Sequence, residues 1–126
     1  MKLLNKFKKV LIVEDDPALL KALVRKVESK GFAVITESSG TPVPLTVVRE
    51  KPAGILLDLM LPGQDGLKLL AQLRSTEIDY KKPVVILTNL HGRAGLRDEA
   101  ERLQAVYLDK ASTSIGAAVD ALVKQL

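Results

Sequence analysis

The chain has 126 residues, no cysteine and a formal net charge of +4. This length suits one domain that buries a real core. The lack of cysteine excludes a disulfide framework and thiolate chemistry and fits a cytoplasmic location. No apolar run approaches the roughly 20 residues of a membrane-spanning helix, and the start lacks the apolar segment of a signal peptide. We therefore expect a cytoplasmic domain that does not contact a membrane.

The positive charge gathers in residues 1–9, which we interpret as a basic N-terminal leader. Four of the nineteen Lys and Arg lie there without an acid, and the other fifteen equal the fifteen Asp and Glu of residues 10–126. A nucleic-acid-binding domain should instead gather basic residues on one folded face. We expect no direct nucleic-acid binding, a folded domain over residues 10–126, and a leader whose unpaired charges contribute little to folding.

The first elements are a strand and a helix. Residues 10–13 are an apolar run, typical of a strand buried on both faces, and acids follow it directly at Glu14, Asp15 and Asp16. Asp16 before Pro17 is typical of a helix N-cap. Apolar residues then recur at helical spacing until Lys30-Gly31, where we expect the helix to end.

A second strand is predicted over residues 32–36. It is followed by a weaker helix over residues 41–50, because this segment is rich in Val and Thr. Pro42 and Pro44 must lie in the first turn of that helix, where a missing N–H is tolerated.

The most informative stretch is 54–66, Gly-Ile-Leu-Leu-Asp-Leu-Met-Leu-Pro-Gly-Gln-Asp-Gly. Residues 55–57 are a buried-strand run that ends in Asp58. Pro62-Gly63 and Asp65-Gly66 then turn the chain, and a helix is predicted from Leu67 to about Ser75. Asp58 thus follows the carboxyl end of a buried strand, where open α/β sheets bind ligands. If Asp58 merely capped the loop, the charged ends of the other strands would stay unexplained.

The rest of the chain repeats this alternation. A fourth strand over residues 84–87 ends in Thr88-Asn89, and a loop in which we expect His91 to be exposed leads to a charged helix over about 94–104. A short fifth strand over 106–108 ends in Asp109-Lys110. Ser112 or Thr113 is expected to cap a last helix, whose apolar stripe runs from Ile115 to Leu126.

Five strands alternating with five helices predict the α/β class, with a parallel sheet covered by helices on both faces and right-handed crossovers. Five strands suit the flavodoxin-like, doubly wound order 2-1-3-4-5. In this order the first and third strands flank the switch point, and they are the two strands that end in carboxylates.

Four strand ends then meet at one edge of the sheet. Three carboxylates at this edge repel each other unless a cation joins them. Oxygen ligands without His or Cys select a hard ion such as Mg²⁺, which tends to share a phosphate. A lysine and a hydroxyl on the far side suit an anion opposite the metal. The residues that follow the four strands, Glu14-Asp15, Asp58, Thr88 and Lys110, therefore predict a site for Mg²⁺ and a phosphoryl group, with one carboxylate as nucleophile.

On these residues the chain resembles the receiver domain of two-component response regulators, over essentially all of Val10 to Leu126. Residues 58–66 are similar to the family's phosphoacceptor loop and carry the resemblance most specifically. The resemblance implies a signalling domain that catalyses only its own phosphorylation and dephosphorylation. Asp58 would take a phosphoryl group from a histidine kinase or phosphotransfer protein, and the domain would act as a monomer or weak dimer on an unknown output partner.

The resemblance also implies roles for the neighbouring residues. Besides Asp58, the Mg²⁺ ligands would be Asp15 directly, Glu14 through water and the backbone carbonyl of Met60. Thr88 and Lys110 would each bind a phosphate oxygen. Tyr107 would be the aromatic switch residue, together with Thr88, and the surface of the fourth helix, fifth strand and fifth helix would change.

The sequence departs from the family's pattern at three places. Ala111 replaces the usual proline after the lysine, Asn89 replaces a small residue after the threonine, and residues 103–106 lack the usual glycine and acid. These departures leave open a pseudo-receiver that acts as a phosphorylation-independent interaction module. A Mg²⁺-dependent phosphohydrolase or a Toprim-like nucleic-acid enzyme would need Asp-x-Asp after a strand, and neither Asp15-Asp16-Pro17 nor Asp58-Leu59-Met60 supplies it.

Overall fold

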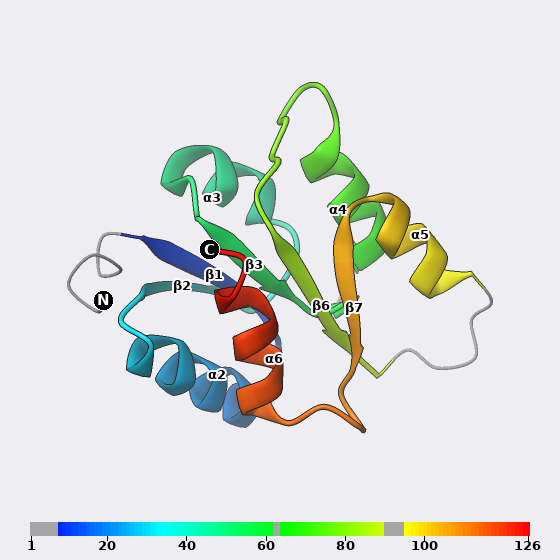
Figure 1. Ribbon diagram of the computed structural model, residues 1–126. Coiled ribbons are helices and arrows are strands. Elements are labelled where there is room, and N and C mark those ends of the chain that lie inside the picture. The colour runs from blue at the N-terminus through cyan, green and yellow to red at the C-terminus, as the bar shows by residue number, and fades with distance from the viewer. Residues whose placement is uncertain (1–7, 62–63, 90–94) are drawn as a thin grey trace.

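The computed structural model describes residues 8–61, 64–89 and 95–126. Its centre is a five-stranded parallel sheet (Figure 1), in the order β2-β1-β3-β6-β7. This order confirms the predicted 2-1-3-4-5 arrangement of a flavodoxin-like fold. The strands are β1 (Lys9–Val13), β2 (Ala33–Glu37), β3 (Gly54–Leu57), β6 (Val84–Thr88) and β7 (Ala105–Asp109).

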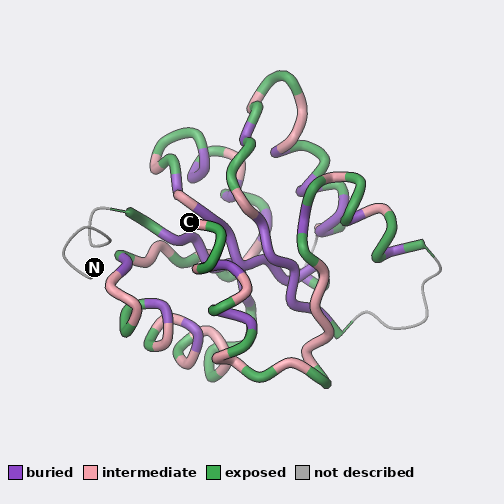
Figure 2. Tube along the Cα trace, viewed as in Figure 1, coloured by how far each residue is buried: buried purple, intermediate pink, exposed green. Residues whose placement is uncertain are grey.

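Helices cover both faces of the sheet, as the doubly wound pattern predicts (Figure 1). The helices α2 (Pro17–Ser29) and α6 (Ile115–Val123) pack on one face; α3 (Val43–Glu50), α4 (Gly66–Arg74) and α5 (Leu96–Arg102) cover the other. Every residue of β3 and β6 is buried (Figure 2). That burial on both faces explains why these strands are continuous apolar runs rather than alternating ones.

The local start and stop signals mostly act where the sequence predicts them. Asp16 caps α2 by accepting a hydrogen bond from the Ala18 amide at 3.0 Å, and Gly31 follows the helix with φ of 94°. At α3, Pro42 is the N-cap residue and Pro44 lies in the first turn.

The expected cap of the last helix, Ser112 or Thr113, is wrong. Ser114 caps α6 by accepting a hydrogen bond from the Ala117 amide at 3.0 Å. Ser112 instead belongs to the turn after β7, where its amide donates to the Asp109 carbonyl at 3.2 Å. The cap falls on Ser114 because Ile115 is the first residue whose backbone is helical.

The chain enters the sheet earlier than the apolar pattern indicates. β1 begins at Lys9, which pairs with Ala33 of β2, and the Lys8 carbonyl accepts a bond from the Ala33 amide at 3.1 Å. Lys9 is also not unpaired, because its ammonium lies 2.8 Å from a Glu50 carboxylate oxygen. Residues 1–7, the rest of the basic leader, lie outside the described residues.

Other boundaries differ where the local signal is weak. Two short antiparallel strands that the sequence does not predict, β4 (Met60–Leu61) and β5 (Gln64–Asp65), pair between β3 and α4. The turn predicted at Pro62-Gly63 and the loop with His91 lie outside the described residues. α5 begins at Leu96 rather than near residue 94.

Arg74, the last residue of α4, ties two connections together at the edge where β6 and β7 begin. Its guanidinium donates to the carbonyls of Tyr80 at 2.7 Å, Lys82 at 2.8 Å, Leu103 at 2.9 Å and Gln104 at 3.2 Å. Gln104 has φ of 61°, a conformation that favours glycine. The Arg74 clamp, the set of charge-assisted bonds from its guanidinium, thus holds the carbonyl of Gln104 and that of Leu103 before it.

No helix among residues 8–61, 64–89 and 95–126 combines the length and the apolar character that crossing a bilayer requires.

Candidate functional site

The predicted site residues follow the carboxyl ends of adjacent strands. Val13 and Leu57 are register partners, so Glu14 and Asp58 leave the sheet side by side. The Asp58 amide donates to the Val13 carbonyl at 3.0 Å, which continues the ladder past the end of β3. The backbone therefore fixes where these two carboxylates begin.

The structure brings the three predicted carboxylates together. One oxygen from each of Glu14, Asp15 and Asp58 lies within 4.8 Å of the others. Asp15 is exposed, whereas Glu14 and Asp58 are only 2% and 4% exposed. Asp16 stays apart as the cap of α2, and its amide donates to Glu14 at 3.1 Å. The cluster therefore has two buried members and one that faces solvent.

Lys110 reaches this cluster from the far side of the sheet edge. Its ammonium lies 2.9 Å from a Glu14 oxygen and 2.9 Å from Asp58 Oδ2. Its amide donates to the Thr88 carbonyl at 3.0 Å, which anchors the start of the loop after β7. The prediction placed this lysine opposite the metal, facing an anion; in the structure it bridges two of the carboxylates.

Burial and ion pairing both shift the pKa values of Glu14 and Lys110. Burial raises the pKa of the Glu14 carboxyl above its ordinary value, although the bond from Lys110 acts in the opposite direction. Burial also disfavours the charged form of Lys110, but the bonds to Asp58 and Glu14 outweigh it and its pKa is raised. Lys110 is thus a permanent cation that offsets the charge of buried acids.

The loop after β3 holds Asp58 in place. Asp58 Oδ1 accepts a hydrogen bond from the Met60 amide at 2.9 Å, so both carboxylate oxygens have a donor. At the other end of the loop, Asp65 caps α4 through the Leu67 amide at 2.9 Å. The Asp65-Gly66 pair, which predicted a turn, therefore starts a helix.

Gly66 is a site-supporting residue that the sequence interpretation missed. A Cβ atom at this position would lie 2.4 Å from Leu59 Cα and 2.8 Å from the Leu59 carbonyl oxygen. The Gly66 amide donates to that same carbonyl at 3.2 Å. α4 therefore starts directly against the backbone next to Asp58. The sequence marked Gly66 only as part of a turn, and the structure shows that it is the first residue of α4, where a better helix former is usual.

Thr88 and Tyr107 lie on the two strands beyond β3. Thr88 ends β6, is 1% exposed and pairs in register with Asp109. Tyr107 lies on β7 opposite Ile86 and is half-buried. The Arg97 guanidinium of α5 lies 4.8 Å from the centroid of the Tyr107 ring. This contact is a direct link between α5 and β7.

Two of the three departures from the expected pattern, Asn89 and Ala111, lie around these strand ends. Asn89 is exposed after Thr88, and the Lys110–Ala111 peptide bond is trans. Ala111 is held by a hydrogen bond from its amide to the Asp109 carboxylate at 2.9 Å. Neither residue contributes to the carboxylate cluster.

The donor set fits a hard divalent cation. Carboxylate oxygens without nitrogen or sulfur donors are the ligands that Mg²⁺ prefers. Glu14 and Asp58 are buried beside each other with one lysine between them, and the exposed Asp15 adds a third negative charge. The cluster therefore keeps more negative charge than Lys110 neutralises.

Comparison with known proteins places this geometry in a family. The response regulator receiver domain family matches residues 10–114. The alkaline phosphatase synthesis transcriptional regulatory protein PhoP of Bacillus subtilis is 37% identical over 81 residues, which are 64% of this chain and 33% of PhoP. Response regulator MprA of Mycobacterium leprae is 36% identical over 80 residues, 64% of this chain and 34% of MprA. The aligned part thus spans about a third of the length of these relatives.

Solved structures agree over nearly the whole chain. The BeF₃-activated N-terminal receiver domain of Klebsiella pneumoniae RstA superposes with a TM-score of 0.79 and 30% identity, covering 94% of this chain and 97% of that one. A CheY-like receiver domain from Methylobacillus flagellatus superposes with a TM-score of 0.78 and 27% identity, covering 94% of this chain and 98% of that one. With its sheet order, its acidic strand ends and a family match over most of its length, the chain belongs to the response regulator receiver domains of two-component systems.

Proposed function

We propose that this receiver domain accepts a phosphoryl group on Asp58 from a histidine kinase or phosphotransfer protein, with Mg²⁺ in the acidic cluster. The observation that carries the proposal is the approach of three carboxylates to within 4.8 Å of one another. Such a cluster suits a divalent cation and a phosphoryl group better than it suits a phosphorylation-independent interaction module, which has no need of clustered acids. The domain is a signalling switch whose chemistry is confined to its own phosphorylation and dephosphorylation.

The chain's own residues would act as follows. An Asp58 oxygen attacks phosphorus, a new P–O bond forms, and the P–N bond of the donor phosphohistidine breaks, leaving the imidazole to take a proton. Mg²⁺, held by Asp15, Asp58, the Met60 carbonyl and Glu14 through water, would lower the repulsion between carboxylate and phosphoryl oxygens. Lys110 leaves its bridge to Glu14 and Asp58 and pairs with a phosphoryl oxygen. The Thr88 hydroxyl donates a hydrogen bond to another phosphoryl oxygen.

Replacing Asp58 tests the proposal. With acetyl phosphate and Mg²⁺, the intact mass of the wild-type chain should show one phosphoryl group that hydroxylamine removes, as expected for an acyl phosphate. Asp58→Ala should show none, while Asp120→Ala, an exposed acid on α6, should label like the wild type. Labelling of Asp58→Ala to the level of the wild type would remove Asp58 from this role, and labelling of the wild type in EDTA would remove the requirement for Mg²⁺. A wild type that takes no phosphate would favour the interaction module.

Asp15→Asn should weaken Mg²⁺ binding by at least about tenfold, because one charged ligand is lost from a small set. The fold should stay intact, since Asp15 is exposed. The measurement is calorimetric titration of Mg²⁺. The matched control is Asp16→Asn, the same change one residue later, where asparagine can still cap α2 and the affinity should stay close to that of the wild type. Equal affinities of the two variants would place the metal elsewhere.

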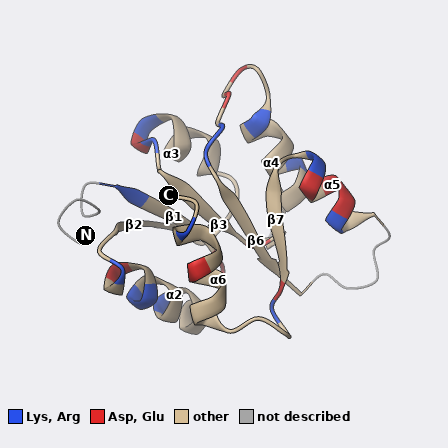
Figure 3. Ribbon diagram, viewed as in Figure 1, with Lys and Arg blue, Asp and Glu red and all other residues tan. Residues whose placement is uncertain are grey.

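We further propose that phosphorylation changes the face formed by α5, β7 and α6. Thr88 and Lys110 lie at the two ends of the segment that contains α5 and β7, so both ends respond when a phosphoryl group binds. When Thr88 moves toward the phosphate it vacates space that the Tyr107 side chain can fill. α5 should be the easiest cover to shift, because it is the shortest of the described helices and only Leu96 and Ala100 anchor it in the core. Its other five residues are acids and arginines (Figure 3).

Amide shifts with and without beryllofluoride should measure this coupling. They should be largest near Asp58, Thr88 and Lys110 and should continue through Arg97 to Tyr107. Tyr107→Ala should still be phosphorylated but should lose the remote shifts. Shifts that run along α2 instead would show that the α5–β7–α6 face is not the switch, and remote shifts that persist in Tyr107→Ala would remove Tyr107 from the coupling.

The wider setting is also part of the proposal. The domain would work in the cytoplasm as a monomer or weak dimer, receive its phosphoryl group from a kinase or phosphotransfer protein, and act on an unknown output partner without itself binding nucleic acid. The balance of fifteen basic and fifteen acidic residues over residues 10–126 supports the last point.

A further inference from the structure

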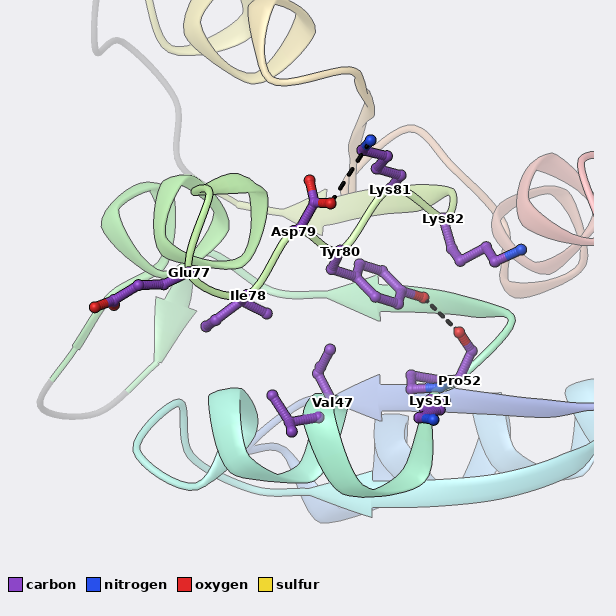
Figure 4. A pocket seen from close by; sticks show the side chains of 10 residues that line it. Val47, Lys51, Pro52, Glu77, Ile78, Asp79, Tyr80, Lys81 and Lys82 are labelled. Carbon is purple, nitrogen blue, oxygen red and sulfur yellow. Dashed lines mark hydrogen bonds and ion pairs between the residues drawn. The ribbon is translucent and has the colours of Figure 1, made fainter.

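A groove lies at the edge of the sheet opposite the carboxylate cluster, where the strands begin. It runs between the end of α3 and the connection 77–82 that precedes β6 (Figure 4), and its volume is about 580 Å³. We call it the α3 groove. Its apolar lining includes Val47 and Val48 from α3 and Ile78 and Tyr80 from the connection.

The walls of the α3 groove are held in place before any partner arrives. Tyr80 is 7% exposed, and its hydroxyl donates to the Pro52 carbonyl at 2.8 Å, which joins the two walls. The Arg74 guanidinium also binds the carbonyls of Tyr80 and Lys82 and so fixes the backbone of the 77–82 connection. A partner would therefore meet a preformed surface and would not have to order these loops.

Apolar side chains extend the groove onto the outer face of α3. Val48 is 55% exposed and Leu45, one helical turn earlier, is 63% exposed. These are the two most exposed large hydrophobic residues of the chain segments that the structure describes. Val48 lines the groove, so the apolar strip runs from Leu45 into it without a break.

Charge distinguishes the two ends of the groove. Lys51 and Lys82 lie at the end near Pro52, and Glu77 lies at the other end (Figure 4). An adjoining hollow of about 360 Å³ shares Lys51 and Lys82 and adds Lys8. None of these three lysines has an ion-pair partner among the described residues, whereas Lys81 pairs with Asp79 and Lys9 with Glu50. The end near Pro52 therefore carries an excess of positive charge.

We propose that the α3 groove docks an amphipathic helix of a partner protein, with apolar side chains between Val48 and Ile78 and acidic residues toward Lys51 and Lys82. The walls are a helix and a loop rather than a strand edge, so an extended peptide would leave its backbone groups unpaired against the apolar floor. A helix satisfies those groups internally. Because the groove is hollow and its lining is apolar, an amphipathic helix fits it better than a partner with a flat anionic surface would.

The position of the groove gives the docking a distinct role. Asp58 follows the carboxyl end of β3, whereas Lys51 and Pro52 precede its amino end. A helix in the groove would not obstruct a phosphodonor at Asp58, so a partner can stay bound while the phosphoryl group is exchanged. The groove thus adds a binding surface that does not depend on the phosphorylation proposed above.

Two labelled peptides of roughly 18 residues, long enough to form a helix, test the proposal. Both have leucines at positions i, i+3, i+4 and i+7; one carries glutamates beside this face and the other carries lysines. In Mg²⁺-free buffer without phosphodonor, fluorescence anisotropy should show saturable binding of the acidic peptide about tenfold tighter than that of the basic one, the effect expected of a few exposed charge pairs. Amide shifts should fall on residues 45–51 and 77–82.

Variants decide between this groove and non-specific attraction. Lys51→Glu combined with Lys82→Glu should invert the preference for the two peptides, and Val48→Asp should weaken both. Lys21→Glu, an exposed lysine on α2, is the matched control and should keep the wild-type preference. No saturable binding, an unchanged preference in the double variant, or shifts confined to other faces would overturn the proposal. Because no step requires phosphate, a failure at Asp58 would leave this result unaffected.

Discussion

Gly66→Ala should destabilise the domain by about 2 kcal/mol, although alanine is intrinsically the better helix residue. The added Cβ would lie 2.4 Å from Leu59 Cα, a backbone atom that cannot rotate away. Either α4 or the Asp58–Leu59 segment must move, and overpacking of a tight contact costs this order of free energy. The measurement is urea unfolding, with the midpoint and slope compared between variant and wild type.

The matched control is the same substitution in another helix. At Gly116, in the first turn of α6, a Cβ would meet only the flexible end of Lys26 at 3.7 Å. Gly116→Ala should therefore be stabilising by roughly 0.5–1 kcal/mol through helix propensity. If Gly66→Ala were also stabilising, the close approach of α4 to Leu59 would not exist in solution. Gly66→Ala should in addition slow labelling of Asp58 by acetyl phosphate, because the segment that shifts is the one that carries the proposed nucleophile.

Lys110→Met should lower the free energy of unfolding in Mg²⁺-free buffer by about 3 kcal/mol, the lower end for breaking a buried ion pair. Lys110 is 16% exposed and lies 2.9 Å from both Glu14 and Asp58, whose side chains are almost fully buried. Methionine keeps most of the volume but leaves two buried carboxylates facing each other. Thermal and urea unfolding should both report the loss.

Mg²⁺ should restore stability to Lys110→Met more than it stabilises the wild type. At the proposed site, Mg²⁺ would have to compete with the Lys110 ammonium for the carboxylates of the wild type, whereas in the variant it would not. The variant should therefore bind Mg²⁺ more tightly, although it lacks the lysine that we propose to hold a phosphoryl group. Recovery that is no greater than in the wild type would show that the metal and the lysine do not share these ligands.

The control for this variant is Lys9→Met, the same change in the ion pair with Glu50. Both partners are partly exposed, at 44% and 31%, so water screens the interaction. Its stability should stay close to that of the wild type and should not respond to Mg²⁺. If Lys9→Met lost as much free energy of unfolding as Lys110→Met, the effect would come from removing any lysine charge and not from the buried cluster.

Much of the fold could be predicted from the sequence because its signals are local. A continuous apolar run such as residues 55–57 predicts a strand covered on both faces, and caps such as Asp16 mark where helices begin. Alternation of strands and helices then leaves few arrangements, and five strands suit the order that the structure has. The acidic ends of β1 and β3 meet because parallel neighbours end at the same edge, so the approach of Glu14 to Asp58 is a consequence of topology that the sequence already determined.

The tertiary structure alone decided what those residues touch. Lys110 is far from Glu14 and Asp58 in the sequence, and its side chain could have faced an anion or solvent; only the packed position of β7 brings it between the two carboxylates. Gly66 is a turn signal in the sequence, yet it is required because α4 starts against Leu59. The α3 groove likewise depends on the spacing between α3 and the 77–82 connection. The Lys110 contacts and the groove join segments remote in sequence, and the contact of Gly66 with Leu59, although the two are only seven residues apart, depends on where α4 packs. No local pattern of residues encodes these distances.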